Sequence, residues 1–246
     1  MRYIINYLTV SLAVLMTACG QKDTQDSGLV LHYDFEQSEM GVVKDLGPNH
    51  IDATLMGNAL VADGSLVLTG ENDYLDMTAA AGEMVKQLAD LTIATNYYVA
   101  PETEIKGYGY FLWCFSCLEA NAEKDGPYQA YRINEQRCET SIGGWSQETG
   151  IQKSQKSELG KWVSVVFRQQ GSKGELYIGG ELIGTDETFP VLCETFAEVP
   201  AFNWMGRAPF NGDKFLENTR ISDFRIYNKS LSDAELQELL KEYSQE

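Results

Sequence analysis

Basic residues and histidines are scarce in this chain. It has 19 lysines and arginines against 36 aspartates and glutamates, which gives a formal net charge of −17, and only two histidines. Nucleic acids and anionic lipid surfaces bind clusters of lysine and arginine, so the composition argues against both as partners. Sulfated or uronate-rich polysaccharides are disfavoured for the same reason, unless a local basic patch or Ca²⁺ intervenes. We interpret most of the acidic charge as a solvated surface.

The sequence also lacks an internal repeat, a low-complexity tract and a second linker. One β-sandwich can occupy roughly 200–250 residues. A hydrophobic content of 43% is enough for a substantial core. We therefore predict a single domain over residues 29–246.

One long apolar run, from Ile4 to Met16, follows Met1-Arg2 and is too short to span a membrane. It ends in Leu15-Met16-Thr17-Ala18-Cys19, which resembles a bacterial lipobox. The resemblance implies a signal peptide over residues 1–18, lipidation of Cys19 and a polar tether over residues 19–28. Gly20 does not resemble the aspartate that retains lipoproteins at the inner membrane. We expect an outer membrane lipoprotein on the periplasmic or the cell-surface side; the alternative is an ordinary secretory signal with an incidental cysteine.

Four further cysteines, Cys114, Cys117, Cys138 and Cys193, would meet an oxidising compartment in an exported protein. An even number favours disulfides, with three connectivities open, and we expect Cys117–Cys138 across neighbouring strands. No second Cys-x-x-Cys or histidine pair completes a zinc site, and residues 113–117 read as a strand rather than a redox motif. Free buried thiols are the alternative.

Short alternating segments bounded by Gly, Asn and Asp recur along the chain. In the first, Leu29, Leu31 and Tyr33 alternate with more polar neighbours, as in a strand with one buried face. Many such segments at ~8–12-residue spacing predict an all-β fold of two antiparallel sheets. Two helical patches are also expected, one over residues 79–88 and a closing helix after Ser232, which forms a capping box with Glu235.

Both ends of the chain carry a family resemblance. Residues 221–243, ISDFRIYNKSLSDAELQELLKEY, resemble the closing segment of laminin-G-like, concanavalin A-like jelly-roll domains, and residues 33–36 and 45–50 resemble their opening. Residues 160–184 are similar to the central run of the same family. The resemblance implies a concanavalin A-like jelly roll, a two-sheet antiparallel β-sandwich with a short C-terminal helix. This fold hosts lectins, adhesins, enzymes and spacer modules, so it does not decide the function.

Catalysis is not expected. Glycosidases need two carboxylates about 5–10 Å apart. In enzymes of the concanavalin A-like family that this chain resembles, both carboxylates come from one strand, in runs such as Glu-x-Asp-x-Glu. No such run occurs here. Asp34 and Glu36 have a suitable spacing but lie on the opening strand, where the family has no catalysis. His32 and His50 do not lie in the basic strands that lyases of this fold use, and no nucleophilic serine elbow is present.

Sugar binding uses aromatic faces together with planar polar groups that fix hydroxyls. Trp145 follows Gly143-Gly144, where packing explains an aromatic side chain less easily than in a strand. Tyr131 and Arg132 point to opposite faces if their run is a strand, so one of them can face a ligand. Trp204 and Arg207 match a family strand whose Arg is commonly structural. The candidate ligand-binding residues are Trp145, Tyr131, Arg132, Trp204 and Arg207.

The resemblance also implies a structural Ca²⁺ where the opening loop meets the closing strand. Calcium takes six to eight oxygen ligands, and the candidate ligands are Glu36, Asp45, Asn49 and Asp223. Ser222 stands where many relatives have an acid. The alternative is that Asp45 and Asn49 form turns and that Glu36 and Asp223 are solvated.

The leading hypothesis is a non-catalytic, lipid-anchored carbohydrate-binding module of a bacterial envelope. Its partner would be a glycan or an envelope protein, with membrane contact only through the anchor and no nucleic acid. A structural or protein-interaction domain without a sugar site is the second hypothesis. The third is a glycoside hydrolase or lyase with atypical carboxylates that converge in the largest cleft.

Overall fold

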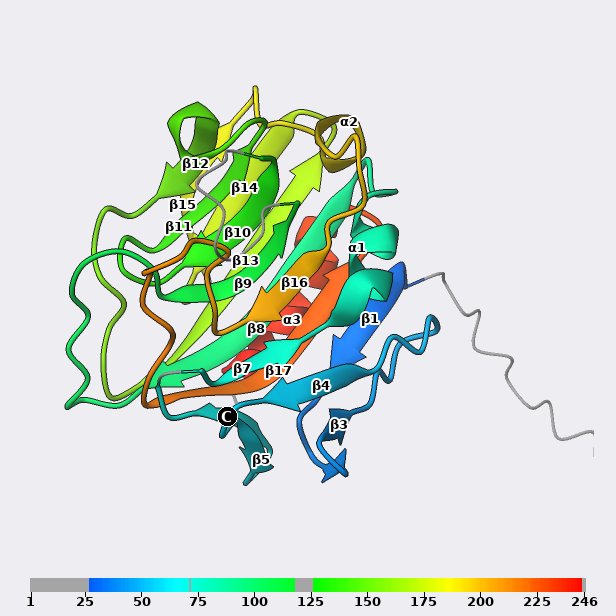
Figure 1. The fold of residues 1–246 in the computed structure, drawn as a ribbon. Helices are drawn as coiled ribbons and strands as arrows, with labels where there is room; N and C mark the ends of the chain where they lie inside the picture. The colour runs from blue at the N-terminus through cyan, green and yellow to red at the C-terminus, as the bar shows by residue number, and fades with distance from the viewer. Residues whose placement is uncertain (1–26, 71, 118–125, 245–246) are drawn as a thin grey trace, which may run out of the picture.

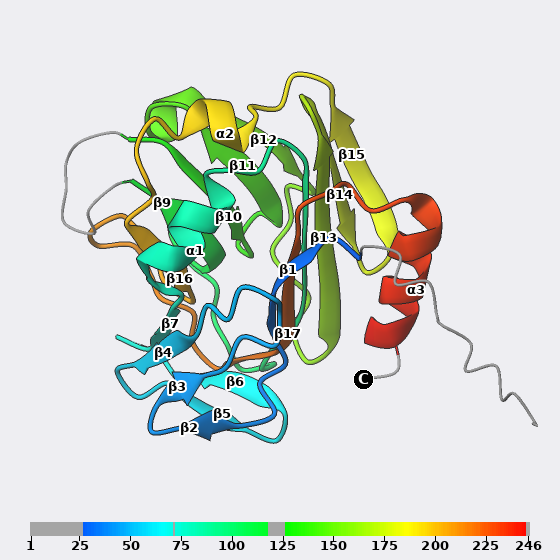
Figure 2. The same ribbon diagram turned by 90° about the vertical axis from the view of Figure 1, so that its right-hand side faces the viewer.

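Two antiparallel β-sheets stack face to face in the computed structural model, which describes residues 27–70, 72–117 and 126–244 (Figures 1 and 2). The predicted all-β, two-sheet sandwich is therefore confirmed. The predicted signal peptide, the lipidated Cys19 and most of the tether lie outside the described residues. Within the described part, no helix is long and apolar enough to cross a membrane.

The first sheet has eight strands among the described residues, in the order β15-β14-β13-β8-β17-β6-β5, with β1 also paired to β17. The long central pair β8–β17 joins the middle of the chain to its closing segment. Its strands are β1 (Leu29–Tyr33), β5 (Leu60–Ala62), β6 (Ser65–Leu68), β8 (Leu91–Val99), β13 (Trp162–Gln170), β14 (Lys173–Ile178), β15 (Glu181–Asp186) and β17 (Thr219–Tyr227).

The second sheet has nine described strands, in the order β12-β11-β10-β9-β16-β7-β4-β3-β2. Its β9–β12 half is made of consecutive antiparallel neighbours. The strands are β2 (Ser38–Glu39), β3 (Val42–Val43), β4 (Ala53–Met56), β7 (Tyr74–Asp76), β9 (Phe111–Ser116), β10 (Tyr128–Arg132), β11 (Arg137–Ser141), β12 (Glu148–Gln152) and β16 (Phe202–Met205).

Short helices flank the sheets: α1 (Thr78–Val85), α2 (Leu192–Thr195), α3 (Asp233–Tyr243) and the 3₁₀ turn η1 (Trp145–Gln147). The helical patch predicted over residues 79–88 corresponds to α1. The predicted capping box of α3 is present, with Ser232 and Glu235 each bonding the other's backbone N–H. Figure 2 shows α3 on the outer side of the first sheet, where Leu236, Leu239 and Tyr243 are buried.

Aromatic side chains fill the space between the sheets. Trp113 of β9 is fully buried, stacks on Tyr131 at a ring-centroid distance of 5.1 Å and lies 6.1 Å from Phe224 of β17. Its indole N–H donates to Gln129 Oε1 at 2.9 Å, so burial leaves no orphaned donor. Phe224 in turn lies 6.4 Å from Tyr33. This chain of rings fixes the inner faces of β9 and β10, and alternation sends the next side chains outward.

The predicted Cys117–Cys138 disulfide is wrong, because Cys114, Cys117, Cys138 and Cys193 are all free. Strand β10 lies between β9 and β11, and Cys138 stands opposite Trp113 two strands away. Neighbouring strands are about 4.8 Å apart. Cys138 is therefore already too distant from β9 for a disulfide, which needs Cα atoms within about 7 Å.

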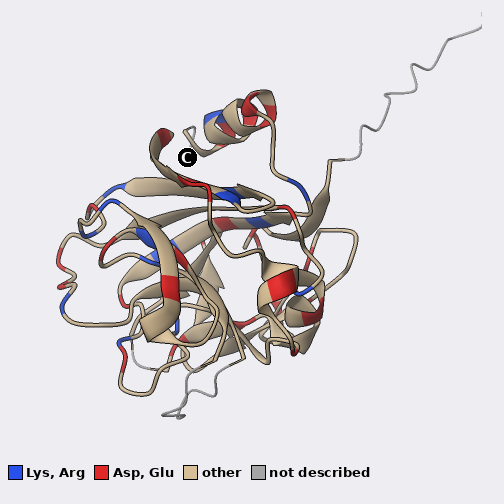
Figure 3. Ribbon diagram, turned by 90° about the horizontal axis from the view of Figure 1, so that it is seen from above, with Lys and Arg blue, Asp and Glu red and all other residues tan. Residues whose placement is uncertain are grey.

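Acidic residues are distributed over many elements of the chain. Asp and Glu positions occur on strands, loops and helices around the molecule, with Lys and Arg among them (Figure 3). This distribution agrees with the predicted solvated acidic surface.

Candidate functional site

A cavity of about 490 Å³ lies on the outer face of the second sheet, over β9–β12. Four aromatic side chains, two arginines and three carboxylates line it. We call it the aromatic cavity, and its lining is Tyr108, Phe111, Arg132, Glu135, Arg137, Trp145, Glu148, Phe210 and Asp213.

The floor of the aromatic cavity is an apolar cluster on the outer face of β9 and β10, separate from the core between the sheets. Phe210 packs edge-on against Tyr128, with ring centroids 5.5 Å apart, and lies 6.3 Å from Phe111. Cys114, Ala130 and Ala208 complete the cluster. The loop after β16 is thereby held against the sheet and forms one wall of the cavity.

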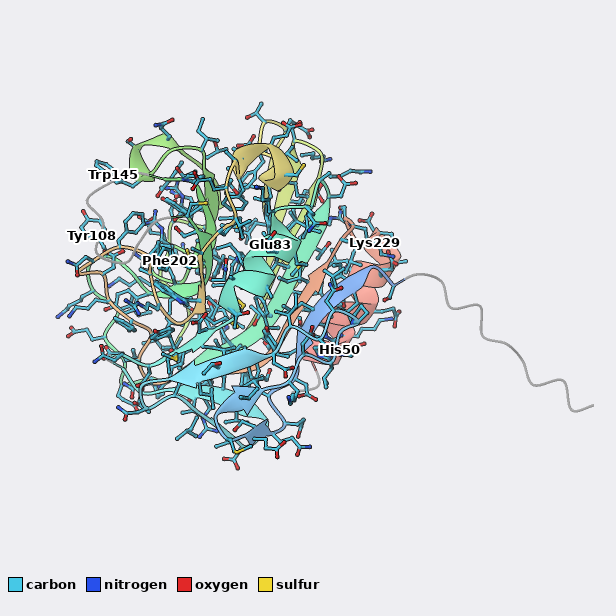
Figure 4. All side chains as sticks on the ribbon, turned by 45° about the vertical axis from the view of Figure 1, so that its right-hand side comes forward. His50, Glu83, Tyr108, Trp145, Phe202 and Lys229 are labelled. Carbon is cyan, nitrogen blue, oxygen red and sulfur yellow. The ribbon has the colours of Figure 1, made fainter. Side chains whose placement is uncertain are left out.

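Two of the aromatic side chains are exposed to solvent. Trp145 is 68% exposed and Tyr108 is 78% exposed. Figure 4 shows both on the same side of the molecule. Burial of large aromatic side chains stabilises a protein. Two such side chains that remain exposed beside one cavity therefore indicate a binding surface.

Glycines position both exposed rings. Gly144, just before Trp145, has φ of 105°, and Gly107 and Gly109 on either side of Tyr108 have φ of 83° and 105°. These are conformations that glycine adopts at little cost. Added side-chain bulk at Gly109 would collide with the backbone of Lys214.

Backbone hydrogen bonds attach the Tyr108 loop to the loop that carries Asp213. Lys214 N donates to Tyr108 O at 3.1 Å, and Tyr110 N donates to Lys214 O at 2.9 Å. Tyr108 and Asp213 are distant in sequence, and this bridge places them in one rim. The backbone segments that carry the exposed ring and the carboxylate are therefore held together.

A network of ion pairs underlies the polar side of the aromatic cavity. Arg132 Nη2 lies 2.9 Å from Glu135 Oε2 and 3.2 Å from Glu139 Oε2. Arg137 Nε lies 2.8 Å from Glu139 Oε2, and its Nη2 lies 3.1 Å from Glu148 Oε2. Tyr128 donates its hydroxyl hydrogen to Glu148. Partly buried charges held by several partners have little freedom to reorient.

Glu139 is fully buried beneath this network. Burial raises the pKa of its carboxyl group to about 8, Arg132 and Arg137 oppose the rise, and Glu148 adds to it. Burial, Glu139 and Glu148 also raise the pKa of Tyr128, so its hydroxyl keeps the proton that it donates.

Asp213 differs from the other carboxylates of the aromatic cavity. It is half-buried and makes no hydrogen bond or ion pair with any residue that the structure describes. Burial raises the pKa of its carboxyl group to about 6, with Arg132 opposing the rise. The oxygens of Asp213 are thus available to a ligand.

The predicted ligand-binding residues fall into three groups. Trp145 and Arg132 both line the aromatic cavity. The prediction of Tyr131 as a ligand residue is wrong, because its side chain is fully buried against Trp113. The inference that Tyr131 and Arg132 face opposite sides is confirmed, with Arg132 on the outer side.

Trp204 and Arg207 do not line the aromatic cavity. Trp204 is only 6% exposed, and the guanidinium carbon of Arg207 lies 4.2 Å from the centre of its ring. The same guanidinium also stacks on Tyr74, at 4.8 Å. This cation–π stack stabilises the end of β16 and occupies the ring face that a sugar would need.

The sequence reasoning missed seven of the nine lining residues, and Tyr108, Glu148 and Asp213 are the most informative of these. Tyr108 had a signal, because it stands between Gly107 and Gly109, and the identified Trp145 likewise has glycine beside it in Gly143-Gly144-Trp145. Glu148 and Asp213 had none that can be separated from an ordinary surface acid. The missed lining residues are Tyr108, Phe111, Glu135, Arg137, Glu148, Phe210 and Asp213.

The predicted calcium ligands do not form a metal centre. Asp45 is buried and accepts hydrogen bonds from the backbone N–H groups of His32 at 2.8 Å, Gly47 at 2.7 Å and Ile51 at 2.8 Å. Asn49 donates to Val30 O at 2.9 Å. Both side chains fix the opening loop. This agrees with the alternative that Asp45 and Asn49 form turns.

The carboxylate of Asp223 also has partners within the protein. Its oxygens lie 2.8 Å from His32 Nε2, 3.0 Å from Arg225 Nε and 2.6 Å from the hydroxyl of Tyr243, which joins α3 to β17. Glu36 is exposed and faces the cavity beside it. No group of three or more His, Cys, Asp or Glu side chains suited to a metal ion occurs in the part of the chain that the structure describes. The residues present therefore do not fit the predicted calcium site.

Two stacked antiparallel sheets with a short C-terminal helix are the architecture that the resemblance of the two ends implies. A family model described as the concanavalin A-like lectin/glucanases superfamily matches residues 70–237. The chain belongs to this superfamily, as the resemblance of its two ends implies. No curated protein matches the sequence significantly.

Solved structures share the fold at low sequence identity. Domain 4 of AbnA, a GH43 extracellular arabinanase from Geobacillus stearothermophilus, solved in complex with arabinotriose, has a TM-score of 0.63 and 16% identity, over 86% of this chain and 98% of that domain. The receptor binding domain of a botulinum neurotoxin C/D mosaic serotype has a TM-score of 0.60 and 15% identity, over 89% of this chain and 51% of that chain.

A Trypanosoma rangeli sialidase in complex with sialic acid has a TM-score of 0.61 and 17% identity, over 87% of this chain. This chain spans about a third of the sialidase, 32% of its length. At these identities the likeness shows the shared fold alone.

Proposed function

We propose that this protein is a non-catalytic carbohydrate-binding module and that the aromatic cavity is its glycan site. The observation that carries the proposal is the pair Tyr108 and Trp145, two exposed aromatic side chains that border one cavity with fixed polar groups. Sugars present C–H faces that pack on aromatic rings and hydroxyl groups that pair with planar polar side chains. Both kinds of contact are available here.

The size and rigidity of the aromatic cavity support the proposal. Its volume of about 490 Å³ falls within the roughly 300–1,000 Å³ of ordinary small-ligand sites. Arg132 and Glu148 are held by the ion-pair network before any ligand arrives. Binding would therefore order few side chains, and this lowers the entropy that association costs.

The structural neighbours agree with a glycan ligand at a coarse level. The arabinanase domain solved with arabinotriose is matched over nearly its whole length, 98%. Of the three neighbours described above, this domain is the one that the chain covers most fully, and it was solved with an oligosaccharide. The ligand itself is not transferred to this chain.

A glycosidase would need two available carboxylates, and among the described carboxylates of the aromatic cavity only Asp213 is unpaired, whereas Glu135 and Glu148 have partners that argue for binding. Glu148 contacts both arginines and accepts from Tyr128, and Glu135 contacts Arg132. A carboxylate between two guanidinium groups is a weak nucleophile and a weak base. Its role is better explained as orientation of the arginines.

We further propose that Cys19 carries a lipid that holds the domain at the outer membrane. In Figure 4, β1 and Lys229 lie at the side of the molecule opposite to Tyr108 and Trp145. The described chain begins next to β1. An anchor that precedes β1 would leave the aromatic cavity facing away from the membrane and open to glycans.

A glycan array tests the proposed function. The chain without residues 1–26, which keeps every described strand and helix, is applied with and without Ca²⁺, beside the Trp145→Ala variant. We expect binding that Trp145→Ala weakens roughly tenfold or more, to or below the detection limit of the array, and no reducing ends released from the bound glycan. A blank array contradicts glycan binding and favours a protein-interaction domain, and released reducing ends contradict the non-catalytic assignment.

A further inference from the structure

The charges of the aromatic cavity are unbalanced. Arg132 and Arg137 supply the positive charge of the lining, and Glu135, Glu148 and Asp213 supply the negative charge. Buried Glu139 lies directly beneath and contacts both arginines. With Glu139 protonated, three carboxylates face two guanidinium groups, and with Glu139 ionised there are four. The site carries a negative excess in either state.

Neither guanidinium group is free for an anionic ligand. Arg132 contacts Glu135, Glu139 and Glu148, and Arg137 contacts Glu139 and Glu148. A sugar carboxylate or sulfate would have to displace one of these carboxylates and leave it unpaired in a partly buried site, which is costly. Sialic acid and uronic acids are therefore poor ligands for this cavity.

The surplus negative charge is Asp213. Its carboxylate has no partner among the described residues, whereas Glu135 and Glu148 each pair with an arginine. It lies on the loop that Lys214 bridges to Tyr108, so an exposed aromatic ring and an unpaired carboxylate share the rim. Aromatic faces attract cations, and a carboxylate beside them strengthens the attraction.

We propose that the aromatic cavity selects glycans that carry a free, protonated amino group, with Asp213 as the acceptor of the ammonium and Tyr108 and Trp145 as the aromatic walls. This inference rests on the proposed glycan site and specifies its ligand class. An N-acetylated sugar of the same shape lacks the charge and leaves Asp213 unpaired. The ammonium of such a ligand would balance the excess negative charge of the site, which a neutral sugar ring cannot do.

Calorimetric titration with four tetrasaccharides tests the inference. They are the tetramers of glucosamine, of N-acetylglucosamine, of glucose and of galacturonate. We expect the glucosamine oligomer to bind the wild-type chain roughly tenfold or more tightly than its acetylated form, the effect of one partly desolvated cation contact. Asp213→Asn should remove this preference. Asp63→Asn, an exposed carboxylate remote from the aromatic cavity, should keep it.

A pH series gives a second readout. Since the pKa of Asp213 is about 6, the ratio of the wild-type affinity to the Asp213→Asn affinity for the glucosamine oligomer should fall as the pH is lowered from 7 to 5, and the same ratio for the glucose oligomer should not. Titration of the ligand's amino group affects both proteins alike and cancels in this ratio. Equal binding of glucosamine and N-acetylglucosamine oligomers, or tightest binding of galacturonate, overturns the inference and leaves the glycan site standing. Binding of none of these, together with a blank array, overturns both.

Discussion

Arg137 Nη2 lies 3.1 Å from Glu148 Oε2, and this contact joins β11 to the first residue of β12, directly after the η1 turn that carries Trp145. Tyr128 of β10 donates to the same carboxylate. Three adjacent strands and the aromatic side chain at the rim are thus connected through one glutamate. The aromatic cavity is shaped by the sheet itself rather than by loops alone.

Replacement of this glutamate should therefore affect both folding and binding. We expect Glu148→Gln to lower the free energy of unfolding by about 1–3 kcal/mol, because Arg132 and Arg137 lose a charged partner in a partly buried site. Glycan affinity should also fall. Chemical denaturation measures the first effect, and Glu83→Gln, an exposed glutamate of α1, serves as the matched control. A loss of stability equal to that of the control would show that the network is not structural.

Tyr108 should act through its ring. Because its side chain is 78% exposed, we expect Tyr108→Ala to change the free energy of unfolding by no more than ~0.5 kcal/mol. The same change should weaken glycan binding roughly tenfold, the value of one stacked aromatic face. Tyr108→Phe keeps the ring and should keep most of the affinity. If the alanine and phenylalanine variants bind alike, stacking on Tyr108 is not part of recognition.

Asp213 should make stability depend on pH. Burial raises the pKa of its carboxyl group to about 6 in the folded protein, above the ordinary value of 3.8. A carboxyl group with a raised pKa favours folding while it is protonated, and this contribution is lost as the pH rises through the folded pKa. The wild-type chain should thus lose stability between pH 4 and pH 7 relative to Asp213→Asn, which stays neutral.

Melting temperatures of the two proteins across this range measure the effect. We expect them to be similar near pH 4, with the variant melting at the higher temperature near pH 7. A difference that is constant with pH would mean that Asp213 titrates as an ordinary exposed carboxylate.

The cysteines should react as free thiols of unequal access. Burial raises the pKa of Cys114 and Cys138 well above the ordinary range and that of Cys117 to about 11, whereas Cys193 is exposed. In the chain without residues 1–26, a thiol reagent should modify one cysteine rapidly in the native state and four after unfolding. Cys193→Ser should remove the rapid phase. Only two reactive thiols in denaturant would indicate a disulfide.

The fold could be predicted from the sequence because its signals are local. Alternation on β1, the capping box of α3 and the turn residues between short strands each act over a few residues. The family resemblance of the two ends then assigned these elements to one architecture. In the structure those ends meet, since β1 pairs with β17.

The candidate site could be predicted only in part. Trp145 was identified because two glycines precede it, and Arg132 because it alternates with Tyr131. Asp213 and Glu148 become site residues only through long-range pairing, by the Lys214 bridge and by the register of β11 with β12. Calcium ligation could not be decided from the sequence, because Asp45 and Asp223 look the same there whether their oxygens accept hydrogen bonds from N–H and O–H groups of the protein or face a metal.

The central claim is that the aromatic cavity binds glycan through Trp145, and the dissociation constant of an array-selected glycan tests it most directly. Calorimetry measures this constant for the wild-type chain, Trp145→Ala and Ile142→Ala. Trp145 lines the aromatic cavity, whereas Ile142 is a nearby exposed apolar side chain that does not line it. We predict that Trp145→Ala weakens binding roughly tenfold or more and that Ile142→Ala leaves it unchanged. Equal affinities for all three proteins would contradict the account and place the glycan elsewhere on the domain.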